Sequence, residues 1–257
     1  MTHEFTAPDG LTLRYHSWSR TPDPALPPVL LLHGFSASAL LNWEAPGVVE
    51  ALVAAGRTVY ATDARGHGAS DKPHDEERYG EVLMAEDVRR FIDHVGASEM
   101  HVAGYSMGAI VTLLAAAGDT RITRLVAGGV GAGVVEVGGL DTRRMPPELV
   151  SAALTADDLD EVPEQARGFR VLAEASGADR LALAAQIRAM FRGPMPLDRI
   201  TVPALVLAGE DDPLAVRPEV LASALPDAEV TVVSGDHLGA VRDPRFAAAI
   251  TEFLGRG

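Results

Sequence analysis

The feature of this sequence that most constrains its fold is an alternation of short apolar runs with amphipathic segments. Four apolar runs lie in the first half of the chain, at residues 28–32, 58–62, 100–103 and 125–130. Helical patterns lie between them at residues 43–55, 79–95 and 107–117. Continuous apolar runs bounded by turn residues predict strands buried on both faces, and their alternation with helices predicts a parallel sheet.

The alternation stops at about residue 131 and resumes near residue 199. The stretch between them shows three helical patterns, at residues 147–161, 163–175 and 179–191. Strand and helix patterns then return at residues 203–208, 218–225, 229–233 and 244–254. We therefore expect a core domain formed by residues 1–130 and 199–257, with residues 131–198 inserted as a helical cap. Residues 11–18 are expected to form an edge strand of the sheet.

Composition and charge exclude several classes of function. The formal net charge is -14 and the chain contains no cysteine. The acidic balance disfavours nucleic acid and anionic membranes as partners, and the lack of cysteine excludes disulfides and thiolate catalysis. Residues 1–10 show no signal-peptide pattern, and no apolar run is long enough to span a membrane. A cytoplasmic protein that acts on a small molecule is expected, while the oligomeric state stays open.

Gly104-Tyr105-Ser106-Met107-Gly108 is the first motif that carries chemistry. It matches the G-x-S-x-G nucleophile elbow and stands between a predicted strand and an Ala/Leu-rich helix. A very tight turn there holds the serine in a strained conformation, and glycine two residues to either side avoids clashes across the turn. Ser106 is therefore the predicted nucleophile.

A second motif, His33-Gly34-Phe35, follows a predicted buried strand. This is where a second donor to an oxyanion hole is found in such a fold, so the backbone N–H of Phe35 is expected to act together with that of Met107. His33 itself is interpreted as a structural residue that braces the loops beneath the site.

The predicted base and acid follow later in the chain. A serine hydroxyl needs a base to take its proton, and the base needs a carboxylate to fix its tautomer. His237 is the one histidine that follows the candidate acids clustered after the strand at residues 203–208. Asp212 is ranked first as the acid because a carboxylate nearer the strand would point away. The competing acids are Glu210, Asp211 and Asp236.

The loop from Asp63 to Asp71 is read as structural. Its glycines at positions 66 and 68 suit tight turns. Asp63 and Arg65 are placed to form a local ion pair beneath the site.

Together these segments resemble the α/β-hydrolase fold superfamily. The matching residues are His33-Gly34-Phe35, Asp63-x-Arg65-Gly66-His67-Gly68-x-Ser70, the Ser106 elbow, Gly209-x-x-Asp212 and His237. The chain looks closest to the small bacterial esterase, haloperoxidase-like and carbon–carbon-bond hydrolase branch. The resemblance implies an eight-stranded, mostly parallel sheet flanked by helices, with a short helical cap inserted after the sixth strand.

The same resemblance bears on the reaction. Haloalkane dehalogenases and epoxide hydrolases of this fold carry aspartate at the nucleophile position, whereas this chain has Ser106. The expected function is therefore a serine hydrolase, carboxylesterase-like, that cleaves a small to medium, largely apolar ester through an acyl-enzyme, with neither metal nor organic cofactor. The alternatives are a carbon–carbon-bond (diketone-type) hydrolase or perhydrolase with the same triad, and a small-molecule receptor that retains the fold.

The substrate pocket is expected to lie beneath the cap. Residues three or four apart on the third cap helix share one face, and Leu238 follows the catalytic histidine, so the expected substrate-binding residues are Ile187, Met190, Phe191 and Leu238. A carbon–carbon hydrolase would also need cations in the cap. The candidates are Arg143, Arg144, Arg167, Arg170, Arg188 and Arg192.

Overall fold

The computed structural model describes residues 1–256, and over this range the chain forms one eight-stranded sheet. The strands lie in the order β1-β2-β4-β3-β5-β6-β7-β8. Their bounds are β1 Thr2–Thr6, β2 Thr12–Trp18, β3 Val29–Leu32, β4 Val59–Thr62, β5 Met100–Tyr105, β6 Ile122–Gly128, β7 Ala204–Gly209 and β8 Ala228–Val233. From β4 to β8 all neighbours are parallel, and β1 and β2 are antiparallel additions. The predicted fold class is confirmed.

The prediction that residues 11–18 form an edge strand is wrong. They form β2, which pairs with β4 on one side and with β1 on the other. β1 is the true edge, and it was missed because it is short and polar. Phe5 is its one fully buried residue, opposite Leu13 in the pairing.

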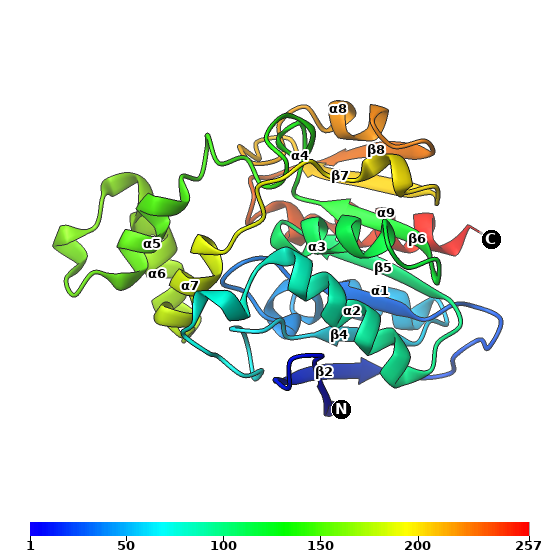
Figure 1. Ribbon diagram of the computed structural model, residues 1–257. Coiled ribbons are helices and arrows are strands. Elements are labelled where there is room, and N and C mark those ends of the chain that lie inside the picture. The colour runs from blue at the N-terminus through cyan, green and yellow to red at the C-terminus, as the bar shows by residue number, and fades with distance from the viewer. Residues whose placement is uncertain (257) are drawn as a thin grey trace.

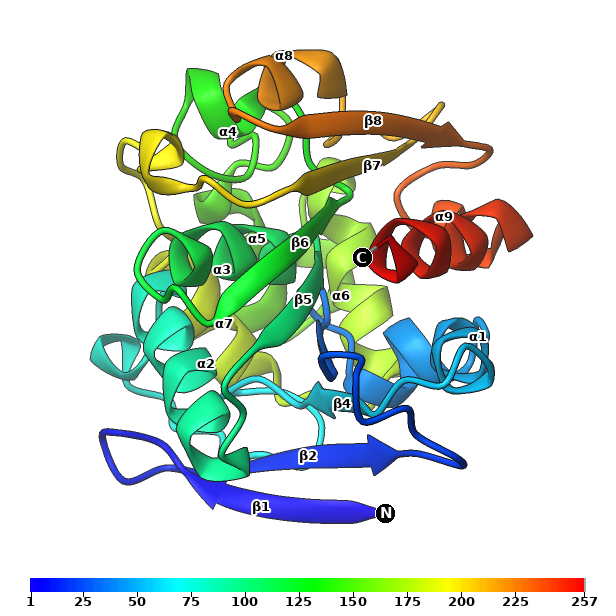
Figure 2. The same ribbon diagram turned by 90° about the vertical axis from the view of Figure 1, so that its right-hand side faces the viewer.

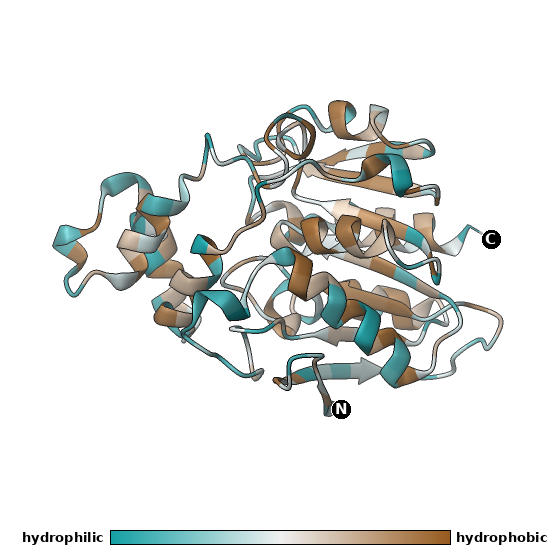
Figure 3. Ribbon diagram, viewed as in Figure 1, coloured by the Kyte–Doolittle hydropathy of each residue, from teal (hydrophilic) through white to brown (hydrophobic). Residues whose placement is uncertain are grey.

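Two layers of helices cover the sheet (Figures 1 and 2). The helices are α1 Val48–Ala54, α2 Glu81–Val95, α3 Met107–Ala116, α4 Gly133–Glu136, α5 Pro147–Thr155, α6 Arg167–Ala175, α7 Arg180–Arg188, α8 Pro218–Ser223 and α9 Pro244–Gly255. Figure 2 shows α1 and α9 on one face of the sheet and α2, α3 and α8 on the other. Each layer encloses its own apolar core. Because both faces are covered by helices, β3 and β5 are buried at every position, and the central strands are largely apolar (Figure 3).

The helices between β6 and β7 project beyond one end of the sheet. Figure 1 shows α5, α6 and α7 grouped at the end toward which the parallel strands run. Three polar contacts join this group and the segment after it to the loop and helix before β5: His74 to Asp179, Glu76 to Arg188, and Glu81 to Phe191. The helical insertion after the sixth strand is thus present. Its treatment as a cap with bounds at residues 131 and 198 stays a prediction.

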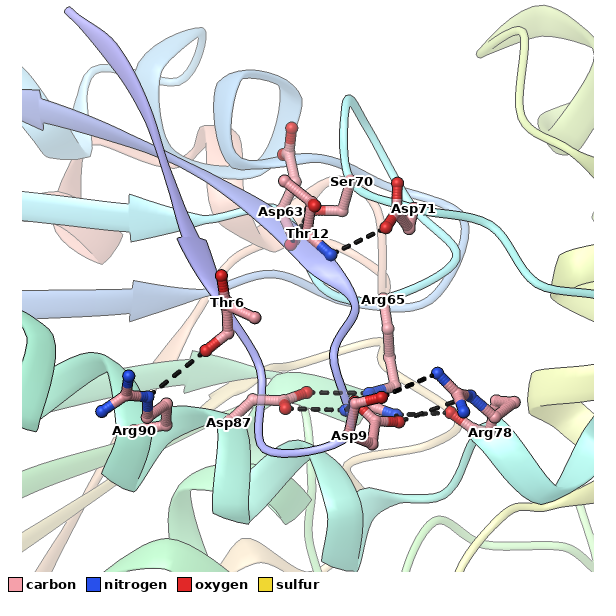
Figure 4. Close-up of polar contacts among 10 residues, drawn as sticks. All are labelled: Thr6, Asp9, Thr12, Asp63, Arg65, Ser70, Asp71, Arg78, Asp87 and Arg90. Carbon is pink, nitrogen blue, oxygen red and sulfur yellow. Dashed lines mark hydrogen bonds and ion pairs between the residues drawn. The ribbon is translucent and has the colours of Figure 1, made fainter.

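The loop after β4 is fixed by a buried arginine (Figure 4). Arg65 donates to Asp87 on α2 at 2.7 and 2.8 Å, and to Asp9 in the turn between β1 and β2 at 2.9 Å. The expected ion pair between Asp63 and Arg65 does not form. Asp63 instead accepts the backbone N–H groups of Ala39 and Ala69, so its carboxylate holds loops together.

Candidate active site

Ser106 occupies a sharp turn between β5 and α3. Its backbone has φ 56° and ψ -116°, a conformation that costs a residue with a side chain on the order of 1–3 kcal/mol. The Ser106 N–H donates to the Gly128 carbonyl at 2.8 Å, which anchors the turn to β6. The strained turn lifts the hydroxyl out of the carboxyl edge of the sheet.

Close packing explains both glycines of the elbow. A Cβ on Gly104 would lie 2.1 Å from the Gly108 carbonyl oxygen, and one on Gly108 would lie 2.1 Å from the Leu32 carbonyl oxygen. Any side chain at either position would push α3 away from the sheet. The two glycines therefore set how closely the helix approaches the strands, and with it the position of Ser106.

His237 and Asp212 complete a chain of hydrogen bonds from Ser106. His237 Nε2 lies 3.0 Å from Ser106 Oγ, and His237 Nδ1 lies 2.8 Å from Asp212 Oδ2. An ionised carboxylate only accepts hydrogen bonds, so Nδ1 carries the proton and Nε2 is free to accept the hydroxyl proton. The side chain of Asp212 is fully buried, and its other oxygen accepts the Leu214 N–H at 2.8 Å.

The competing acids are occupied elsewhere. Asp236 accepts the backbone N–H groups of Leu238 and Gly239, so it shapes the turn that carries His237. Glu210 and Asp211 are exposed. Of the acids weighed from the sequence, Asp212 is the one that the structure brings to His237.

Sequence reasoning missed Tyr105, the residue before the nucleophile. Its hydroxyl donates to the backbone carbonyl of His237 at 2.7 Å, and the two rings lie 5.2 Å apart. Burial raises the pKa of the Tyr105 phenol well above its usual value, so the hydroxyl stays protonated and keeps donating. The signal for this role was its position inside the elbow motif.

The two expected oxyanion donors lie beside Ser106. Met107 is the first residue of α3, where an N–H has no partner within the helix. Phe35 follows Gly34, whose Cα hydrogen faces the nucleophile, since a Cβ there would lie 3.3 Å from Ser106 Cβ. His33 Nδ1 lies 2.8 Å from the Gly34 carbonyl oxygen, which shares a peptide plane with the Phe35 N–H.

His33 and His67 are buried and neutral. The Ala64 N–H donates to His33 Nε2, so the other ring nitrogen is the one that carries a proton. Burial lowers the pKa of His33, and it lowers that of His67 to about 3. Both rings thus join loops beneath the site, as interpreted for His33 from the sequence.

A cavity of about 530 Å³ opens beside the nucleophile. Ser106 and His237 border it together with Gly34, Ser36 and Asn42. Most of the remaining lining is apolar and is formed by Phe35, Leu41, Pro46, Leu172, Leu238 and Val241. A site of this size with a mostly apolar lining accommodates a small, largely apolar ligand.

Of the four expected substrate-binding residues, the structure places one at the cavity and three away from it. Leu238 lines the cavity and is 58% exposed. Ile187 and Met190 are buried in the main apolar core, and the Phe191 N–H donates to Glu81 at 2.6 Å, so these three do not border the cavity. The helical insertion between β6 and β7, here called the cap, reaches the cavity through Leu172 and Ser176, on α6 and just after it.

Comparison with known proteins identifies the fold to which this architecture belongs. Residues 27–134 match the family model described as alpha/beta hydrolase fold. The chain has the α/β-hydrolase fold. In this fold Ser106, His237 and Asp212 are connected as in a catalytic triad.

Two solved structures and one curated protein are similar to this chain. A hydrolase from Pseudomonas aeruginosa is 26% identical, with a TM-score of 0.77 over 99% of this chain and 98% of its own. An esterase from Exiguobacterium antarcticum is 19% identical, with a TM-score of 0.80 over 99% of both chains. Epoxide hydrolase A of Mycobacterium tuberculosis is 36% identical over 89 residues, which are 35% of this chain and 27% of that protein. The chain thus spans about a quarter of this curated relative.

Within residues 1–256, no helix combines the length and apolar character that crossing a membrane requires.

Proposed function

We propose that this α/β hydrolase is a serine esterase that cleaves small to medium, largely apolar carboxylic esters through an acyl-enzyme. The observation that carries the proposal is the pair of contacts at 3.0 and 2.8 Å that joins Ser106, His237 and Asp212, where Ser106 and His237 border a largely apolar cavity.

The proposed reaction has two halves. Ser106 Oγ attacks the ester carbonyl carbon while His237 Nε2 takes its proton, and the Phe35 and Met107 N–H groups bind the oxygen that becomes negative. The tetrahedral intermediate collapses, His237 returns the proton to the leaving alkoxide, and the alcohol departs. Water then attacks the acyl-enzyme with His237 again as base, and the acid and Ser106 are regenerated.

The shape of the cavity supports a largely apolar substrate. Leu41 and Leu238 are more than half exposed and border the cavity, while Leu172 contributes from the cap. Large exposed apolar side chains next to a site bind apolar groups well, because that contact removes their surface from water. The apolar part of the ester is proposed to rest on these leucines.

The carbon–carbon-bond alternative finds little support among the cap arginines. Five of the six candidates contact acidic side chains: Arg143 with Asp141, Arg167 with Glu164, Arg170 with Glu174, Arg188 with Glu76, and Arg192 with Glu148. None of the six borders the cavity beside Ser106 in the described part of the chain. The ester remains the substrate that the lining fits best.

Hydrolysis of p-nitrophenyl esters of increasing acyl length, measured beside a panel of diketones, tests the proposal. We expect turnover of short and medium esters, and labelling of the protein by a fluorophosphonate probe. Ser106→Ala should fold, lose turnover on the order of a millionfold and escape the probe. Labelling or hydrolysis that survives in Ser106→Ala would contradict the proposal, and preferential turnover of a diketone would replace the ester with the carbon–carbon substrate.

A further inference from the structure

The Phe35 N–H lies between two amides whose partners are side chains of other segments. The Gly34 N–H donates to Asn42 Oδ1 at 2.9 Å, and the Ser36 N–H donates to His67 Nε2 at 3.2 Å. Within residues 1–256 the Phe35 N–H itself has no protein acceptor. Both neighbours of the proposed oxyanion donor are thus fixed, while the donor is left for a ligand.

We infer that Asn42 and His67 are positioning residues of the oxyanion hole. They hold the amides on either side of Phe35 and so aim its N–H at the carbonyl of a bound ester. The inference rests on the proposed esterase function, because an oxyanion hole matters only where a negative oxygen develops. Asn42 also borders the cavity, but in this role both residues act through the backbone on either side of Phe35.

A π-helix at Leu40–Glu44 places Asn42. The Ala45 N–H reaches back to the Leu40 carbonyl at 2.9 Å, and this wide turn exposes Leu41 while Asn42 points inward. The carboxamide orientation is settled by its partner. An amide N–H can only donate, so the oxygen faces Gly34 and Nδ2 is left buried without a hydrogen bond.

The carboxamide of Asn42 supplies something that leucine could not, namely the acceptor for the Gly34 N–H. Without that acceptor the Gly34 N–H would lose its hydrogen bond. That acceptor lies close to the nucleophile, since a Cβ on Gly34 would be 3.6 Å from Asn42 Oδ1 and 3.3 Å from Ser106 Cβ.

His67 anchors the other side of Phe35 to the sheet core. His67 Nδ1 lies 3.0 Å from the Arg65 carbonyl oxygen, which fixes Nδ1 as the protonated nitrogen and Nε2 as the acceptor. Arg65 is in turn held by Asp9 and Asp87 (Figure 4). Burial lowers the pKa of His67 to about 3, so Nε2 remains an acceptor throughout the neutral range.

This arrangement predicts an effect on turnover without a matching effect on binding. An ester that has not yet reacted carries little charge on its carbonyl oxygen, so a misdirected N–H changes KM little. The charge develops in the transition state, where a displaced donor lowers kcat. Removing a whole oxyanion donor costs about a hundredfold to a thousandfold, so displacing one should cost on the order of tenfold to a hundredfold.

The experiment compares acceptor-deleting with acceptor-retaining variants, using p-nitrophenyl butyrate. Asn42→Leu and His67→Leu delete the acceptors and should lower kcat tenfold to a hundredfold with KM within about twofold of wild type. His67→Gln can place an amide oxygen where Nε2 was, and should recover most of the lost kcat. Gln186→Leu is the matched control: its carboxamide is also buried with an unpartnered atom, but it lies on α7 and outside the site.

A second readout separates positioning from general loosening of the fold. A trifluoromethyl ketone binds as a tetrahedral oxyanion, so its Ki should rise in proportion to the loss of kcat/KM in both leucine variants and stay unchanged in Gln186→Leu. Equal kcat in wild type and in both leucine variants would overturn the inference, as would a rise in KM alone. If Asn42→Leu does not fold, the comparison of His67→Leu with His67→Gln decides.

Failure of the proposed function would look different. In that case wild type would neither hydrolyse the ester nor react with a fluorophosphonate, or Ser106→Ala would be as active as wild type, and the inference would fall with it. Hydrolysis that depends on Ser106 but not on Asn42 or His67 would keep the esterase and reject only the positioning role.

Discussion

The carboxyl edge of the sheet and the helical cap are held by different kinds of contact. At the edge, a Cβ on either elbow glycine would clash with a backbone carbonyl, and Asp212 is fully buried. Between cap and core, the ion pair of Arg188 with Glu76 joins two side chains that are each about half exposed. Exposed pairs contribute only about 0–1 kcal/mol. The edge is thus built for fixed geometry, whereas the exposed ion pairs of the cap are individually weak and the cap is held mainly by apolar side chains such as Ile187 that join the core.

The largest expected effect lies at the edge. Asp212→Asn should leave the fold intact but favour the wrong tautomer of His237, with a loss of turnover that reaches about ten-thousandfold. Asp211→Asn is the control, because that side chain is exposed one residue away. Steady-state hydrolysis by the two variants measures the contrast. A crippled Asp211→Asn beside an active Asp212→Asn would show that the acid is assigned to the wrong residue.

Matched glycine substitutions probe packing in the two regions. Gly108→Ala should destabilise the protein by about 3 kcal/mol or more, because the added Cβ would lie 2.1 Å from a backbone oxygen of β3. Gly168→Ala, on cap helix α6, meets nothing within 4 Å and should stabilise the helix by up to about 1 kcal/mol. Urea unfolding measures both. Equal effects of the two substitutions would remove the distinction between a tightly packed edge and an open cap.

Two truncations separate the parts of the cap that stabilise from those that select. Ile187→Ala should cost about 2–5 kcal/mol because the side chain is buried in the core. Leu172→Ala should cost less and shift the preferred acyl length, because this side chain borders the cavity. Thermal unfolding and an ester series measure the two quantities. If Ile187→Ala changes the preferred acyl length and Leu172→Ala does not, α7 determines substrate specificity, as the helical pattern of the sequence predicts.

The smallest expected effect concerns the buried contact between core and cap. Burial raises the pKa of Glu81 to about 7 from its ordinary 4.5. The folded state therefore favours the protonated acid, and wild type loses stability as the pH rises from 4.5 through 7. Glu81→Gln keeps an acceptor for the Phe191 N–H without this charge. It should be more stable than wild type by on the order of 1–3 kcal/mol at pH 8 and equal to it near pH 4.5.

Thermal unfolding at the two pH values measures this difference. An advantage of Glu81→Gln that is the same at pH 4.5 and pH 8 would show that the carboxyl group does not titrate in this window.

The core strands and the three triad positions could be read from the sequence because each has a local signature. A buried parallel strand is apolar at every position, as in Val29–Leu32, and the elbow needs glycine at both ends. β1 has no such signature, since its apolar content is a single phenylalanine at a sheet edge. The ranking of Asp212 above its neighbours also came from local geometry, because a carboxylate nearer the end of the strand would point away from the site.

The wall of the cavity could not be read in this way. The helical pattern of residues 179–191 indicates an apolar face but not what that face packs against, and the structure turns it into the core. The place of Leu172 in the cavity wall follows from how α6 lies against the Phe35 loop. The ring centroids of Phe35 and Phe169 are 6.5 Å apart there. The role of Asn42 depends on a π-helix, which periodicity of 3.6 residues does not reveal.

The hydrogen bond between His237 and Ser106 joins residues 131 positions apart in the chain. A contact of such separation must await closure of a long loop, whereas α3 and its neighbours form through nearby residues. During refolding from denaturant, the return of esterase activity should therefore trail the recovery of helical circular dichroism. The return of esterase activity would then report when the last two strands, β7 and β8, join the sheet.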